Sequence, residues 1–265
     1  MSTAATGLTG GGEFELARLA PADRDGCFDE RTIVLLPIGS IQPHGPHLPP
    51  DTDTLLARAR AGRAAELLAE RGARPVVLPA LGYGISRLSQ DFAGGVTLRP
   101  GTLWALLEDL AISLQQDGVR QLVLCNMHHE AEHLRTLTNL AVDLAPRGAG
   151  RCQVLFPDAD SLGGPLLGEV ECLGGRRETA LMLAVAPERV DEGVRADLPP
   201  VELELPPART GRSRSLRELG AGAGYVGAPA EATPEEGREL LEELALVLVE
   251  RSARVWPELF ATGRG

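Results

Sequence analysis

Residues 31–53 read RTIVLLPIGSIQPHGPHLPPDTD, and this stretch decides the fold class. Residues 31–38 form a short apolar run rich in branched side chains, which predicts a buried strand. A polar loop begins at Gly39, and residues 54–71 then combine helical periodicity with strong helix formers. The stretch therefore predicts a strand, a loop and a helix in that order.

The same order recurs along the rest of the chain, and it favours an α/β fold. Alternating strands and helices are typical of a mostly parallel sheet that helices cover on both faces. Residues 194–227, rich in Pro, Gly and Arg, predict an irregular excursion. We expect a flexible tail at residues 1–13 and a single domain at 14–265, because no linker or repeat divides the chain. The further strands are expected at residues 75–78, 121–125 and 152–156, and the helices at 102–116, 131–144, 177–186 and 234–254.

The composition excludes several classes of protein. Of 265 residues, 43% are hydrophobic and 24% charged, which is typical of a globular protein rather than a disordered or membrane protein. The net charge of −11 opposes binding to phosphates, so we expect no nucleic-acid partner and no membrane association. The sequence contains no lysine, which excludes lysine-based catalysis. Four scattered cysteines and the lack of a signal peptide indicate a cytoplasmic protein.

All five histidines fall in two short segments, and each segment follows a predicted strand. His44 and His47 lie in the first, and His128, His129 and His133 in the second. The carboxyl ends of parallel strands meet at the edge of the sheet where ligands bind, so the two segments are expected to face each other.

Carboxylates accompany these histidines, and the combination is typical of metal ligands. Asp53 follows His44, and Glu130 lies two residues after His128. Imidazole nitrogen and carboxylate oxygen suit zinc, manganese or iron. We therefore expect two divalent ions that activate a hydroxide and polarise a carbonyl, which is the chemistry of hydrolysis.

Other interpretations of the polar residues remain open. His47, His133 and Asp51 also suit structural roles in loops and helix ends. A Ser-His-Asp hydrolase lacks its usual G-x-S-x-G motif, whereas Cys172 remains a candidate nucleophile with a small buried residue as its simpler interpretation.

The sequence resembles the creatininase (creatinine amidohydrolase) family, whose motifs appear in order along nearly the whole chain. The resemblance implies an α/β/α sandwich and a site with two metal ions, zinc or manganese. It also implies hydrolysis of a non-peptide or cyclic C–N amide bond in a small-molecule substrate, and a homo-oligomer, commonly a hexamer. The motifs are LPIGSIQPHGPHLPPDTD at residues 36–53, DFAGGVTL at 91–98, NMHHEAEHL at 126–134, ETALMLAV at 178–185 and GYVGAPAEATPEEGRELLEE at 224–243.

Site residues are carried over from the family one position at a time. By this resemblance His44 is a ligand of one ion, His128 a ligand of the other, and Asp53 the carboxylate that bridges both. Glu130 matches the carboxylate of the second ion, and Glu178 is kept as an alternative because some members use a glutamate near that position.

Two departures from the family separate this chain from a creatininase acting on creatinine. Gln42 stands where the family has a glutamate ligand, and an amide brings no charge, so we expect weaker binding of that ion. Cys172 stands where the family has a histidine that assists proton transfer, so this work is expected to pass to Glu171, Glu130 or His129.

Three alternatives to hydrolysis of a small-molecule amide follow from the departures and the family. The first is a degenerate or inactivated member that binds one metal ion or none. The second is an amide-forming or transamidating enzyme, and the third is a member that trims a precursor peptide.

Overall fold

The strands form a single parallel sheet in the part of the chain that the structure describes. This computed structural model describes residues 12–20, 26–144, 150–158, 173–203 and 215–260. The order of the strands in the sheet is β2-β1-β3-β4. They are β1 (Thr32–Ile38), β2 (Arg74–Val77), β3 (Gln121–Asn126) and β4 (Gln153–Leu155). The predicted strands are confirmed, with ends that differ by no more than one residue.

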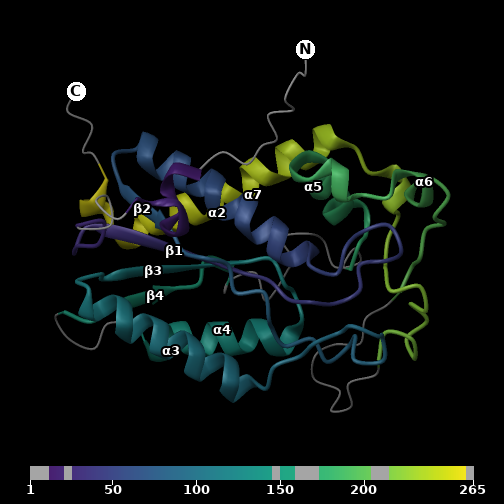
Figure 1. Ribbon diagram of the computed structural model, residues 1–265, viewed down its shortest axis with the longest axis horizontal. Helices are drawn as coiled ribbons and strands as arrows, with labels where there is room; N and C mark the ends of the chain where they lie inside the picture. Colours follow the sequence, from purple (N-terminus) through teal and green to yellow (C-terminus); the bar gives the residue numbers. More distant parts are fainter. Residues whose placement is uncertain (1–11, 21–25, 145–149, 159–172, 204–214, 261–265) are drawn as a thin grey trace.

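Helices cover both faces of this sheet, as Figure 1 shows, so the predicted three-layer α/β/α sandwich is confirmed. Helices α3 and α4 lie on one face, and α2, α5 and α7 lie on the other. The helix predictions were correct to within two residues at each end. The helices are α2 (Thr52–Glu70), α3 (Pro100–Gln116), α4 (Ala131–Asp143), α5 (Arg176–Val185), α6 (Glu192–Arg195) and α7 (Pro234–Val255), with short 3-10 turns η1 (Gly12–Phe14), η2 (Leu16–Arg18), η4 (Pro187–Arg189), η5 (Pro229–Glu231) and η6 (Pro257–Leu259).

Alternating side chains of β1 explain the two layers of the core. Val34, Leu36 and Ile38 point to the face covered by α3 and α4, and Ile33 and Leu35 point to the face covered by α2 and α7. Every residue of β1 is buried, which accounts for the continuous apolar run in the sequence.

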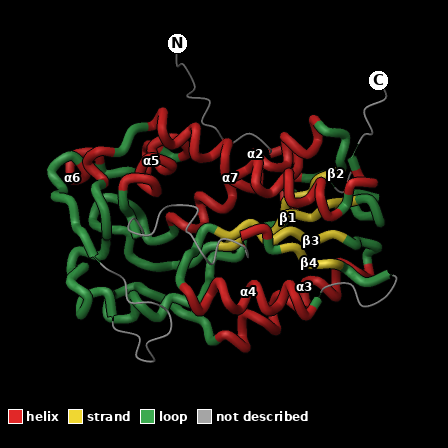
Figure 2. Tube along the Cα trace, turned by 180° about the vertical axis from the view of Figure 1, so that it is seen from behind, coloured by secondary structure: helices red, strands yellow, loops and turns green. Residues whose placement is uncertain are grey.

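The loops gather at one end of the sheet, on the side of α5 and α6 (Figure 2). The carboxyl ends of β1, β2 and β3 lead into loops, of which residues 39–51 and 78–99 are long and 127–130 is short. A bridge from Ile41 to Val96 joins the first two of these loops, and a bridge from Ile38 to Leu81 joins the end of β1 to the second. The polar segments predicted to face each other therefore lie at the same edge.

Two predictions fall wholly or partly on residues outside the described ranges. Residues 1–11 of the predicted tail are among them, and the division into a tail and one domain stays a prediction. Of the predicted irregular segment, residues 204–214 also lie outside the described ranges; in the rest of it α6 ends at Arg195, and a bridge joins Val201 to Gly227. No helix in the described part of the chain combines the length and the apolar composition that crossing a bilayer requires.

Candidate metal centre

Three side chains of the types that bind metal ions come together from one loop and the first turns of two helices. His44 lies in the loop after β1, Asp53 in the first turn of α2 and Glu178 in the first turn of α5. Their ligand atoms all lie within 4.8 Å of one another, and all three side chains are buried. Both carboxylates therefore lie at helix N-termini, where the helix dipole favours negative charge.

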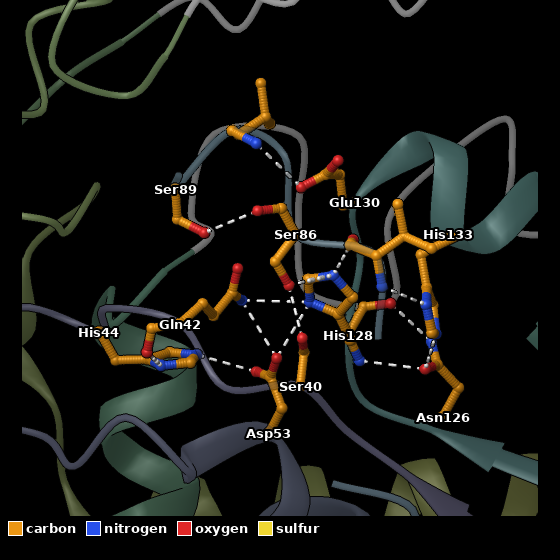
Figure 3. Close-up of polar contacts among 12 residues, drawn as sticks. Ser40, Gln42, His44, Asp53, Ser86, Ser89, Asn126, His128, Glu130 and His133 are labelled. Atoms are coloured by element: carbon orange, nitrogen blue, oxygen red, sulfur yellow. Dashed lines mark hydrogen bonds and ion pairs between the residues drawn. The ribbon is translucent and has the colours of Figure 1, made fainter. Parts of the chain in front are cut away.

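Asp53 lies between two histidines, with one carboxylate oxygen toward each (Figure 3). Oδ1 is 2.8 Å from Nε2 of His44, and Oδ2 is 3.0 Å from Nδ1 of His128. Burial would raise the pKa of Asp53, but the two histidines outweigh burial and hold this pKa well below its usual range. Asp53 thus keeps its negative charge in the interior of the protein.

Backbone carbonyls determine which nitrogen of each histidine faces Asp53. Nδ1 of His44 lies 3.1 Å from the carbonyl oxygen of Gln42, and Nε2 of His128 lies 2.7 Å from that of Ile85. These nitrogens must donate, because a carbonyl oxygen only accepts. The other nitrogen of each ring is left to face the carboxylate, as in metal sites whose outer partners orient the ligands.

The charges around His44 attract a cation. Burial alone would lower the pKa of His44, but Asp53 and Glu178 outweigh burial and raise this pKa to about 9. Burial raises the pKa of Glu178 despite the nearby His44. A field that strongly favours a positive imidazole equally favours a divalent cation among the same atoms.

A close approach of two loops brings Glu178 to His44. Gly174 has φ of +71°, and a Cβ there would lie 2.3 Å from the carbonyl oxygen of His44, so only glycine allows this contact. The Gly174 amide donates to Oε2 of Glu178 at 2.6 Å, and this oxygen lies 3.8 Å from Nε2 of His44. The sequence kept Glu178 only as an alternative ligand, whereas the structure places it in the group.

Glu130 is turned toward a neighbouring loop. Its two oxygens accept hydrogen bonds from the backbone amides of Arg87 and Leu88, at 3.0 and 3.2 Å. The compact group of ligand atoms found among the described residues does not include Glu130. Burial raises the pKa of this carboxyl. Its assignment as a metal ligand stays a prediction.

The remaining candidates divide into structural contacts and positions outside the described residues. Nε2 of His47 lies 2.9 Å from the Thr179 hydroxyl, and burial lowers the pKa of His47 to about 4. Burial also lowers the pKa of His129 to about 4, and its Nε2 is buried without a hydrogen-bond partner in the described structure. Glu171 and Cys172 lie outside the described residues.

Sequence reasoning did not identify Ile85 and Ser86 in the loop after β2, which completes the surroundings of His128. Besides the Ile85 carbonyl, this loop supplies Ser86, whose Oγ lies 3.3 Å from Nε2 of His128. Ser86, His128 and Asp53 therefore line up like a hydrolytic triad, but Nε2 carries a proton for Ile85 and is not free to act as a base. The rule that ligands bind at the carboxyl edge of a parallel sheet applies to this loop as well, but neither Ile85 nor Ser86 is a histidine or an acid.

The family follows from a comparison with known proteins. The family model described as creatinine amidohydrolase matches residues 19–251. The chain belongs to the creatininase family. This confirms the resemblance seen in the sequence motifs, which span nearly the same residues.

Two relatives in the creatininase family differ in what they act on. A protein of Mycolicibacterium smegmatis named mycofactocin precursor peptide peptidase is 31% identical over 231 residues, covering 85% of this chain and 86% of the relative. The creatinine amidohydrolase of Pseudomonas putida is 30% identical over 265 residues, covering 87% and 88%. A solved structure of creatinine amidohydrolase (creatininase) superposes with a TM-score of 0.71 at 25% identity and covers 92% of this chain and 98% of that one. This creatininase-family chain is therefore similar both to a protein named as a peptidase of a precursor peptide and to one named as a creatinine amidohydrolase.

Proposed function

We propose that this chain is a metal-dependent hydrolase of amide C–N bonds. The observation that carries the proposal is the buried convergence of His44, Asp53 and Glu178 within 4.8 Å. One imidazole and two carboxylates form a nitrogen and oxygen donor set that suits zinc or manganese. Two creatininases of known structure are described as a Zn-Zn type and a manganese form, and the same two metals are our candidates here.

The chemistry divides between the bound ion and the protein. A divalent ion in such a site acts as a Lewis acid on a carbonyl and makes water acidic enough to supply a nucleophile at neutral pH. His44, Asp53 and Glu178 would hold the ion. The carbonyls of Gln42 and Ile85 fix the tautomers of His44 and His128, so these rings do not need to reorient when substrate binds.

The leaving nitrogen needs a proton, and we propose Glu130 as its carrier. Glu130 is two residues from His128 and lies outside the group of three ligands, so it is free to accept and return a proton. The amides of Arg87 and Leu88 hold its carboxylate in one orientation. His129 is the second candidate, because its buried Nε2 has no hydrogen-bond partner in the described structure.

Two classes of substrate follow from the relatives. The name of the Mycolicibacterium smegmatis protein favours an amide bond in a precursor peptide, and that of the Pseudomonas putida enzyme favours the cyclic amide of creatinine. Because Cys172 stands where creatininases have a histidine that assists proton transfer, we propose the peptide amide first and the small cyclic amide second.

Turnover of both substrate classes tests the proposal. Protein loaded separately with Zn²⁺ and Mn²⁺ is incubated with creatinine and with a panel of short peptides, and the products are identified by mass spectrometry. The matched variants are Asp53→Asn and Asp51→Asn. The Asp51 side chain lies outside the ligand group and bonds Arg189 at 3.1 Å, so it controls for the loss of an acid in this loop.

We expect amide cleavage in the unchanged protein, a loss of kcat/KM beyond about 100-fold in Asp53→Asn, and little change in Asp51→Asn. Absence of cleavage in the metal-loaded protein, together with cleavage by Gln42→Glu, would instead identify an inactivated family member. Amide formation from an added amine without cleavage would identify the transamidating alternative.

A further inference from the structure

The side-chain amide of Gln42 lies between the two histidines of the candidate metal centre (Figure 3). Its Nε2 is 3.1 Å from Oδ2 of Asp53 and 3.1 Å from Nδ1 of His128. Both of these atoms are acceptors when His128 donates through Nε2, and the amide carries two hydrogens. The orientation with nitrogen toward them is therefore the one that their chemistry requires.

The Gln42 amide satisfies the half of the centre that contains His128. His128 then donates to Ile85 from one nitrogen and accepts from Gln42 at the other, so the neutral ring has both of its hydrogen bonds. Oδ2 of Asp53 has the same amide as a donor. Glu130, the other acid expected in this half, bonds the amides of Arg87 and Leu88. Among the residues named, each acceptor group in this half therefore has a hydrogen-bond donor.

The half that contains His44 is different. Nδ1 of His44 donates to the carbonyl of Gln42, so Nε2 is the nitrogen that faces the two carboxylates. Nε2 lies 2.8 Å from Oδ1 of Asp53 and 3.8 Å from Oε2 of Glu178. Two buried carboxylates that converge on one nitrogen require a positive charge among them, which a protonated ring or a divalent ion in its place supplies.

A count of charges separates the two halves in the same way. The carboxylates of Asp53 and Glu178 carry two negative charges, which balance one divalent ion. A second divalent ion beside His128 would meet the uncharged Gln42, and the one further acid in this half, Glu130, has both oxygens bonded to the amides of Arg87 and Leu88. An unbalanced charge in a buried site is strongly unfavourable.

We propose that this chain binds one divalent ion through His44, Asp53 and Glu178, and that the Gln42 amide occupies the place of a second ion. This inference rests on the proposed metal dependence and departs from the pair of ions expected from the sequence. The N–H groups of Gln42 supply to Asp53 and His128 the positive partial charge that a second cation would otherwise supply.

The number of ions per chain tests the inference without any activity assay. The unchanged protein, Gln42→Glu and Gln116→Glu are each loaded with excess Zn²⁺ or Mn²⁺, passed through gel filtration and measured by elemental analysis. Gln116 is an exposed residue at the end of α3, so its variant makes the same chemical change away from the centre. We expect one ion in the unchanged protein, two in Gln42→Glu and one in Gln116→Glu.

A second pair of variants identifies which half holds the ion. We expect His44→Gln to lose the ion and His128→Asn to keep it, with circular dichroism showing that both are folded. Should His128→Asn unfold, the comparison of the unchanged protein with Gln42→Glu still decides the stoichiometry.

The contrary results are distinct from failure of the proposed function. Two ions in the unchanged protein would overturn the inference and leave the hydrolase proposal standing. One ion in both the unchanged protein and Gln42→Glu would overturn the role given to Gln42. No ion in the unchanged protein would overturn both proposals, whereas one ion without amide cleavage would overturn the function alone.

Discussion

Arg60 is a charged residue in the middle of the core, and its contacts hold four parts of the chain together. It lies in α2 with no exposed surface and forms a bidentate ion pair with Asp158, with both N–O distances 2.9 Å. The guanidinium also donates to the carbonyls of Asn126 and Leu244, at 2.8 and 3.0 Å. Asn126 is the last residue of β3, which leads to His128, so Arg60 contacts the strand that positions this part of the candidate metal centre.

Removing one partner of this pair should be strongly destabilising. In Asp158→Asn the buried guanidinium loses its counter-charge, and we expect the free energy of unfolding to fall by about 3–5 kcal/mol, measured by urea denaturation. The double variant Arg60→Met/Asp158→Leu, which removes both charges, should be closer to the unchanged protein. A loss below about 1 kcal/mol in Asp158→Asn would show that the charge is solvated in some other way.

His47 should make stability depend on pH. Burial lowers its pKa from 6.5 in the unfolded chain to about 4 in the folded protein. Between these values only the unfolded chain takes up the proton, so the contribution of His47 to stability is complete above pH 6.5 and is lost as the pH falls toward 4. At pH 5.5 the loss is about 1 kcal/mol.

The variant His47→Gln removes this titration. Its free energy of unfolding, measured with a metal chelator present, should fall less between pH 7.5 and 5.5 than that of the unchanged protein. Equal falls in the two proteins would mean that His47 does not stay neutral in the fold.

At the scale of the elements, α5 and α7 cross with their backbones almost in contact. A Cβ at Gly237 of α7 would lie 1.9 Å from the carbonyl oxygen of Ala180 in α5. Backbone cannot yield as a flexible side chain would, so the helices would have to separate. Because α5 carries Glu178, the crossing also sets the distance between that carboxylate and His44.

Gly237→Ala should therefore destabilise the protein far more than a typical helix substitution. We expect a loss of about 3 kcal/mol or more, measured by urea denaturation. Gly101→Ala is the matched control, because Gly101 lies in α3 and nothing lies within 4 Å of its Cβ position. The control should change stability by no more than about 1 kcal/mol, in the stabilising direction. Similar losses in both variants would contradict the close crossing.

The elements were predictable from the sequence because their signals are local. The apolar run of β1 and the periodicity of α2 identify each element from a few consecutive residues. The proximity of His44 and Asp53 was also predictable, because His44 lies in the loop after β1 and Asp53 lies in the first turn of the helix that follows this loop.

The contacts between distant segments were not predictable in the same way. Glu178 joins the centre only because Gly174 lets one loop pass close to another, and local periodicity carries no information about such a contact. The orientations of the Gln42 and Glu130 side chains depend on donors and acceptors supplied by other parts of the chain. The residue types alone therefore indicated metal ligands and did not predict the hydrogen bonds that these side chains make.

Across the whole molecule, the candidate ligands tie the sheet to both α2 and α5, so ion binding should stabilise the entire fold. A ligand that binds only the folded state stabilises it by about 2.7 kcal/mol at a concentration 100 times its Kd. We expect Zn²⁺ or Mn²⁺ to raise the Tm of the unchanged protein, measured by calorimetry, and to leave that of Asp53→Asn nearly unchanged. An equal rise in both proteins would indicate binding elsewhere. The homo-oligomer expected from the family resemblance stays a prediction.

The position of α7 has a consequence for synthesis of the chain on the ribosome. This helix provides none of the candidate ligands, yet it packs against both α2 and α5, which carry Asp53 and Glu178. A nascent chain that has emerged as far as α5 already contains every candidate ligand but lacks the helix that braces them. The proposed centre should therefore reach its full affinity for a metal ion only after α7 has been synthesised and has packed against α2 and α5.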